Sequence, residues 1–263
     1  MTDVARLIDD LRSEGDDLDR LVAGLDADGW ATPTPAEGWS VAHQISHLAW
    51  TDRLASLAAR DPDAFTRELA PAAADPTGYV EAGAVEGALE PPARLLTRWR
   101  RGRRELADRL ATTPPETRLP WFGPPMKVPS MATARIMELF AHGQDVADAL
   151  GVRRAPTPRL RHVAHLGART RDFAYAVHGL TPPADEFRIE LTGPDGSTWA
   201  WGPADAAQRV TGPALDFCLL VTRRRHRADL AVEAHGPDAD RWLDIAQAFA
   251  GLPGSGRAPG QFG

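Results

Sequence analysis

The chain has 263 residues, of which 43% are hydrophobic and 25% charged, as in ordinary globular proteins. Its net charge of -6 argues against a protein that binds nucleic acid. No segment approaches the roughly 20 apolar residues that span a membrane, and the one cysteine, Cys218, excludes an internal disulfide framework. We therefore expect a soluble, cytoplasmic protein with neither a nucleic acid nor a membrane as its partner.

The first half of the chain has the apolar spacing of amphipathic helices. Apolar residues recur every three or four positions from Val4 to Leu25, and Ser40 is a good N-cap for a second helix that runs to about residue 59. Further helices are expected over about 92–110, 130–151 and 158–177. Four long helices joined by short and long connections indicate an antiparallel bundle, with the fifth helix packed against it.

Two connections within the bundle have a distinct composition. Residues 61–92 are rich in Ala, Pro and Gly and indicate a long connection with a short helix around 76–88. Residues 119–126 contain three prolines beside Trp121 and Phe122, and this composition excludes both a regular helix and a central strand. We expect a rigid aromatic loop there.

The pattern changes from period 3.6 to period 2 after Pro182 and Pro183. Residues 187–191 and 198–201 alternate apolar and polar side chains around a Gly-Pro-Asp-Gly turn, which predicts a hairpin. An apolar helix at 213–222, a strand at 230–233 and a last helix at 238–250 follow. We thus predict a helical bundle over 1–180, a small α+β domain over 181–253 and a disordered tail over 254–263.

Three residues from two predicted helices form a candidate metal site. Glu138 and His142 are four residues apart, so they share one helix face, and His47 lies beside the apolar stripe of the second helix. Two imidazoles and one carboxylate are a ligand set that open, catalytic zinc sites use. The alternative is ordinary: isolated histidines are usually core or surface residues, and Glu-x-x-x-His pairs form common surface contacts. Glu138 stands in an apolar stretch, however, where a charge needs a partner.

Two arginine-rich runs stand out against the acidic background, at 98–104 and 223–227. Solvated basic faces are the favoured interpretation of both. The alternative is that they attract an anionic substrate.

These motifs resemble those of the DinB/YfiT-like metal-binding superfamily, in its actinobacterial, mycothiol-dependent maleylpyruvate isomerase-like branch. The similarity rests on Gly-Trp-Ser-Val at 38–41, His47-Leu48, and the Glu-x-x-x-His of Glu138 and His142, and it extends over nearly the whole chain. The resemblance implies a DinB-like four-helix bundle, followed by a small sterol-carrier-like α/β domain. It also implies that His47, Glu138 and His142 bind a divalent metal, usually zinc, as their counterparts in the family do.

The resemblance further implies a function. In that branch the metal activates a low-molecular-weight thiol such as mycothiol, for S-transfer to a small electrophilic substrate or for its isomerisation. Trp39 and Trp121 are candidates to wall the thiol site, although core packing is the alternative for each. Arg223 and Arg225 are candidates, by residue type, for the family's substrate-binding arginine. A metal-dependent hydrolase, lyase or cyclase that uses water, and a non-catalytic metal-binding protein, stay open, as does the choice between monomer and homodimer.

Overall fold

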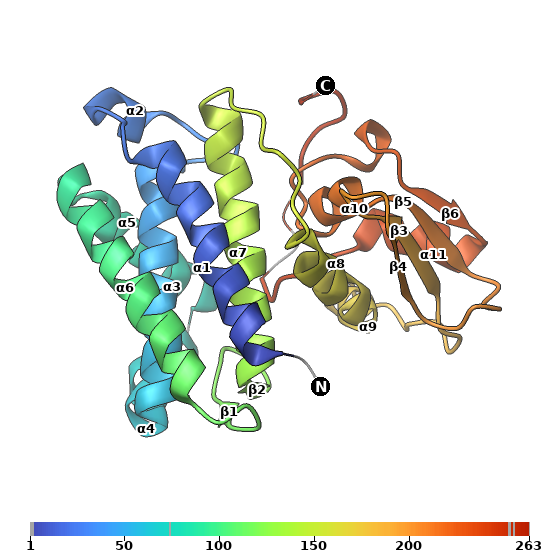
Figure 1. Ribbon diagram of the computed structural model, residues 1–263, viewed down its shortest axis with the longest axis horizontal. Helices are drawn as coiled ribbons and strands as arrows, with labels where there is room; N and C mark the ends of the chain where they lie inside the picture. Colours follow the sequence, from blue (N-terminus) through green and yellow to red (C-terminus); the bar gives the residue numbers. More distant parts are fainter. Residues whose placement is uncertain (1–2, 74, 252–253, 255, 263) are drawn as a thin grey trace. The chain divides into compact units, whose positions relative to one another are not determined.

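The computed structural model describes residues 3–73, 75–251, 254 and 256–262, and it divides into two compact units, Met1–Arg154 and Ala155–Gly263 (Figure 1). The predicted architecture is confirmed: the protein is mainly helical, with a small four-stranded sheet in its C-terminal part. Among the described residues, no helix combines the length and the apolar character that a membrane crossing requires.

Four long helices form the bundle of the first unit: α1 (Val4–Val22), α3 (Val41–Arg60), α6 (Pro92–Thr112) and α7 (Val128–Ala149). Each buries the apolar face that its sequence period predicts. In α1 the buried apolar residues are Leu7, Ile8, Leu11, Leu18 and Val22. The side chain of Asp3 accepts a hydrogen bond from the Arg6 amide and so caps the first turn of α1.

Shorter elements connect these helices: α2 (Ala27–Ala31), α4 (Pro62–Leu69), the 3₁₀ helix η1 (Ala70–Ala73), α5 (Pro76–Ala88), and the strand pair β1 (Arg118–Leu119) and β2 (Met126–Lys127). The helix predicted at 76–88 is confirmed, whereas α4 was expected to be irregular. Both helices begin at an Asp-Pro step, where Asp61 or Asp75 accepts a backbone N–H and the proline occupies the first turn. The aromatic loop predicted at 119–126 is bounded by the paired ends of β1 and β2.

The second unit contains a four-stranded mixed sheet in the order β4-β3-β5-β6. Its strands are β3 (Arg188–Thr192), β4 (Thr198–Trp201), β5 (Arg209–Pro213) and β6 (Glu233–His235). Its helices are α8 (Leu160–Arg169), α9 (Arg171–Val177), α10 (Ala214–Val221), the 3₁₀ helix η2 (Arg227–Asp229) and α11 (Pro237–Ile245). The predicted hairpin is confirmed as the antiparallel pair β3 and β4, and β5 pairs in parallel with β3.

Several details of this unit differ from the predictions. The strand expected at 230–233 lies at 233–235, the last helix ends at residue 245, and β5 was not predicted. The expected fifth helix is two helices that meet at Thr170. The compact units separate after residue 154 rather than near 180, because α8 packs on α10: Gly167 lies against the side chains of Phe217 and Val221.

The C-terminal tail was predicted to be disordered. Part of it, residues 255 and 263, lies outside the described residues. In the described part, the Gly260 amide donates to both carboxylate oxygens of Asp229, at 2.9 Å each, and the Phe262 ring lies 4.5 Å from the Arg225 guanidinium. These contacts tie the tail to its own unit.

Candidate metal centre

The structure brings His47, Glu138 and His142 together between α3 and α7. The Nε2 atom of His142 lies 3.1 Å from Oε2 of Glu138, and Nε2 of His47 lies 3.5 Å from the same oxygen. One ligand atom from each residue falls within 4.8 Å of the other two. His47 is buried, whereas the side chains of His142 and Glu138 are 12% and 23% exposed, so solvent reaches part of the cluster.

These separations fit a small divalent cation. Zinc binds nitrogen and oxygen at about 2.0–2.2 Å, so neighbouring ligand atoms of a tetrahedral site lie about 3.4 Å apart. The two distances to Oε2 of Glu138, 3.1 and 3.5 Å, bracket that value. Two unprotonated ring nitrogens and a carboxylate oxygen would repel one another at this range. The cluster is therefore stable only with a proton or a metal cation among its members.

Gln44 fixes the orientation of one ligand ring. Its Oε1 atom lies 2.6 Å from Nδ1 of His142, while its Nε2 donates to the Thr34 hydroxyl at 2.9 Å. In this arrangement His142 donates its Nδ1–H to Gln44, which leaves the Nε2 lone pair directed at Glu138. Gln44 is fully buried and was missed in the sequence, where a single amide in an apolar helix carries no spacing signal.

Glu138 is held in its charged form. Burial raises the pKa of Glu138, but the hydrogen bonds that His142 and His47 donate to it when their Nε2 atoms carry protons in the metal-free site outweigh burial and hold that pKa well below its usual range. A ligand carboxylate must be deprotonated, so this environment suits metal binding at neutral pH.

Two tryptophan rings lie next to the candidate ligands. The Trp39 ring stacks on His142 at 6.0 Å between centroids and lies 5.4 Å from His47, and its Nε1–H donates to Glu81 at 2.9 Å. Trp50 lies 6.3 Å from His47. Of the two predicted thiol-site tryptophans, the structure thus brings Trp39 to the candidate ligands.

Trp121 has a different environment. Its ring stacks on Phe65 at 5.8 Å and meets Phe122 edge-on at 5.1 Å, within a cluster that packs on buried residues of α3. Phe122 in turn contacts Trp50 at 6.1 Å. Trp121 is therefore linked to the candidate ligands through two intervening rings.

The two arginines singled out in the second unit differ in their surroundings. Arg223 has a φ of 58°, the only positive φ outside glycine in the described part of the chain, and its Nε atom is buried there without a hydrogen-bond partner. Burial lowers the pKa of Arg223. Arg225 donates to the Arg224 carbonyl and stacks on Phe262. Arg223 is the better anion-binding candidate of the two. Its backbone is strained, and its partly buried guanidinium has lost hydration that an anion could replace.

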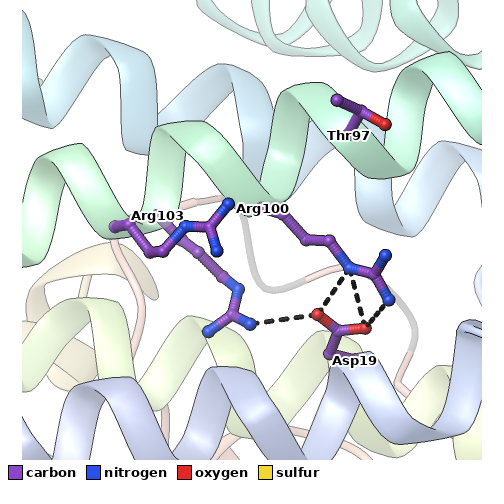
Figure 2. A pocket seen from close by; sticks show the side chains of 5 residues that line it. Asp19, Thr97, Arg100 and Arg103 are labelled. Carbon is purple, nitrogen blue, oxygen red and sulfur yellow. Dashed lines mark hydrogen bonds and ion pairs between the residues drawn. The ribbon is translucent and has the colours of Figure 1, made fainter.

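The basic run of α6 is mostly neutralised. Its arginines form ion pairs with acidic side chains: Arg98 with Glu90, Arg100 with Asp19, Arg101 with Glu105, and Arg103 with Asp16 and Asp19. Figure 2 shows Arg100 and Arg103 converging on Asp19 in a pocket that Thr97 and Arg104 also line. This pocket contains none of the candidate metal ligands. It is also a poor site for an anion, because the Asp19 carboxylate already neutralises its arginines.

Comparison with known proteins identifies families and relatives that this chain resembles. The family described as the mycothiol maleylpyruvate isomerase N-terminal domain matches residues 11–147, a segment that includes all three candidate ligands. A second family, described as wyosine base formation, matches residues 183–234. Two uncharacterised proteins from Mycobacterium tuberculosis, of strains CDC 1551 / Oshkosh and ATCC 25618 / H37Rv, are each 59% identical over 257 residues, which is 98% of this chain and 100% of each relative.

Solved structures support the fold. The crystal structures of the mycothiol-dependent maleylpyruvate isomerase and of a point mutant of it match with TM-scores of 0.61 and 0.60. Their sequence identities are 16% and 14%, and each match covers 89% of this chain and 95% of the other. At this identity the likeness establishes a shared fold.

Proposed function

Because the chain belongs to the mycothiol maleylpyruvate isomerase N-terminal domain family, we propose that it is a cytoplasmic, zinc-dependent enzyme that uses mycothiol. The reaction is the isomerisation of a small electrophilic substrate or the transfer of sulfur to it. One observation carries the proposal: Nε2 of His142 and Nε2 of His47 lie 3.1 and 3.5 Å from the same carboxylate oxygen, Oε2 of Glu138.

Three protein side chains suit a catalytic rather than a structural zinc site. A zinc ion held by two imidazoles and one carboxylate keeps a position open, at which it lowers the pKa of a bound thiol. The protein residues orient and shield this position. Gln44 holds the His142 ring in one tautomer, and Trp39 stacks on the His142 ring and lies against the His47 ring at a tilt. With Glu81 as its hydrogen-bond partner, Trp39 would form one wall for the thiol.

Arg223 is the residue we propose to bind a carboxylate of the substrate. A guanidinium forms forked hydrogen bonds to carboxylates, and a half-buried one without an acidic partner gains most from an anionic ligand. The described residues provide no ion pair for Arg223. Arg223→Gln should raise the KM for a carboxylate substrate and leave the zinc content unchanged. An unchanged KM would assign Arg223 a structural role.

The choice of a thiol over water rests on family membership. The ligand set alone would activate either one, as in a hydrolase, lyase or cyclase. The protein does not need its own cysteine for this chemistry: Cys218 is fully buried, and its Sγ faces the Leu160 carbonyl at 3.4 Å. A separate small thiol therefore fits better than a protein nucleophile.

Calorimetry with mycothiol tests the proposal. The zinc-loaded protein should bind mycothiol, and the metal-free protein and His142→Ala should bind it at least 10-fold more weakly. His235→Ala, which changes an exposed histidine of β6, is the matched control and should behave as the wild type. Equal binding with and without zinc would refute thiol activation and favour metal-bound water. Absence of zinc from the wild type would refute the metal site itself.

A further inference from the structure

A buried ion pair lies next to the candidate metal centre. Arg135 of α7 and Asp52 of α3 are each 2% exposed, and Nε of Arg135 donates to Oδ1 of Asp52 at 3.1 Å. The same guanidinium donates to the Thr51 hydroxyl at 2.7 Å. That hydroxyl in turn donates to the backbone carbonyl of His47 at 2.9 Å. A continuous chain of hydrogen bonds thus leads from α7 to the backbone of a candidate ligand.

The ion pair belongs to a row of polar contacts that cross between α3 and α7. Gln44 meets His142, His47 meets Glu138, and Thr51 with Asp52 meets Arg135. Positions rise along α3 as they fall along α7, so the helices run antiparallel and the contacts are about one turn apart. The candidate ligands occupy the middle contact. The other two bracket it from either side.

Stability alone does not account for the Arg135–Asp52 pair. Burying two charges is unfavourable, and apolar side chains of similar size are often equally stable in such places. The pair is also incompletely satisfied, since Oδ2 of Asp52 is buried and has no hydrogen-bond partner within the described part of the chain. The pair does provide a fixed geometry between the two helices. A planar guanidinium donates hydrogen bonds only in fixed directions, so its acceptors must lie at set positions.

We propose that Arg135, Asp52 and Thr51 are positioning residues that fix how α3 and α7 face each other, and thereby the separation of His47 from Glu138. This role rests on the proposed metal site. A shift of one helix along the other would move His47 relative to Glu138 and His142, which lie together on α7. Such a shift would change the spacing of the three ligands and so weaken metal binding. The apolar packing between α3 and α7 could persist after the same shift.

The test separates metal affinity from folding. Asp52→Asn and Thr51→Val each remove one link and change little volume. Asp19→Asn is the matched control, because Asp19 also pairs with arginines inside the bundle but joins α1 to α6. Zinc affinity is measured by competition with a chelator, and stability by urea unfolding of the metal-free proteins. Asp52→Asn and Thr51→Val should bind zinc about 10- to 100-fold more weakly, as is typical when outer-shell partners are lost, and Asp19→Asn should match the wild type.

The double variant Asp52→Leu/Arg135→Met covers the case in which a single variant fails to fold. It should retain the metal-free stability of the wild type, bind zinc at least 10-fold more weakly, and change the visible spectrum of bound cobalt(II). Wild-type affinity and spectrum in all folded variants would overturn the positioning role alone. A wild type that binds no zinc would instead overturn the proposed function, and the positioning role with it.

Discussion

Gln44 is the single residue whose replacement most simply tests the candidate metal centre. Its amide oxygen accepts the Nδ1–H of His142, and loss of such a partner typically weakens metal binding 10- to 100-fold. We predict that Gln44→Leu weakens zinc binding about 10- to 100-fold. Gln44→Glu keeps an acceptor oxygen and should restore most of the affinity. Chelator competition measures both, and equal affinities in the two variants would contradict this role.

At the residue scale, the sequence predicts the candidate metal ligands better than the residues that orient those ligands. Glu138 and His142 are recognisable because four-residue spacing places two ligand groups on one helix face. Gln44, Thr51 and Asp52 have no comparable signal, since their significance depends on which residues α7 places opposite them. Arg223 was a candidate by type alone, and its positive φ is visible only in the structure.

At the element scale, Gly83 allows α5 to approach α3. A Cβ at this position would lie 2.6 Å from the Trp50 ring, which itself lies 6.3 Å from His47. Gly83→Ala should therefore destabilise the protein by about 1–3 kcal/mol, as overpacking does, and shift the tryptophan fluorescence. Gly102→Ala in α6 is the matched control, because nothing lies within 4 Å of its Cβ. It should stabilise by about 0.5–1 kcal/mol. Equal effects in urea unfolding would argue against this packing.

The contact between α1 and α6 makes stability depend on pH. Burial raises the pKa of Asp19, but hydrogen bonds from Arg100 and Arg103 outweigh it, so the pKa is lowered overall. A lowered folded-state pKa contributes stability above the unfolded value of about 3.9, and this stability is lost as the pH falls through the folded pKa.

Asp19→Asn should accordingly lose about 1–3 kcal/mol at pH 7, the usual range for hydrogen bonds to charged groups. Its free energy of unfolding should also fall less steeply than that of the wild type below about pH 4. Urea unfolding across this pH range gives both quantities. Parallel pH profiles for variant and wild type would exclude the contribution of Asp19.

Elements with a strong period or a clear start signal were predictable from the sequence, and the others were not. The hairpin of β3 and β4 follows from alternation and a turn. Strand β5 ends in Gly212 and Pro213 and is a strand because it pairs in parallel with β3 and antiparallel with β6. Its pairing is a property of the sheet, so no local pattern specifies it.

At the scale of the whole molecule, the first unit contains every candidate metal ligand and its supports. Residues 1–154 include α3 and α7 complete, together with Gln44 and the Arg135–Asp52 pair. We predict that a chain of residues 1–154 binds zinc with an affinity within about threefold of the full protein. Parts of a protein that share no contacts usually contribute independently, so removing the second unit should change zinc binding little. It should lack catalytic activity. A folded 1–154 chain that does not bind zinc would show that the second unit is needed for the metal site.

The boundary between the compact units differs in position from the change of sequence pattern. The change of period near residue 180 marks where strands begin, whereas the compact units separate after Arg154. Helices α8 and α9 have the same local pattern as bundle helices. Only tertiary packing, such as Gly167 against Phe217, assigns α8 to the second unit.

Cobalt(II) substitution tests the central claim most directly, because it reports on the metal, its ligands and the thiol together. The cobalt protein should show visible absorption typical of a four-coordinate site, and mycothiol should add a sulfur-to-cobalt charge-transfer band. His47→Ala and His142→Ala should lose both signals. A cobalt spectrum that mycothiol leaves unchanged would contradict thiol activation, and full retention of cobalt in both variants would contradict the metal site.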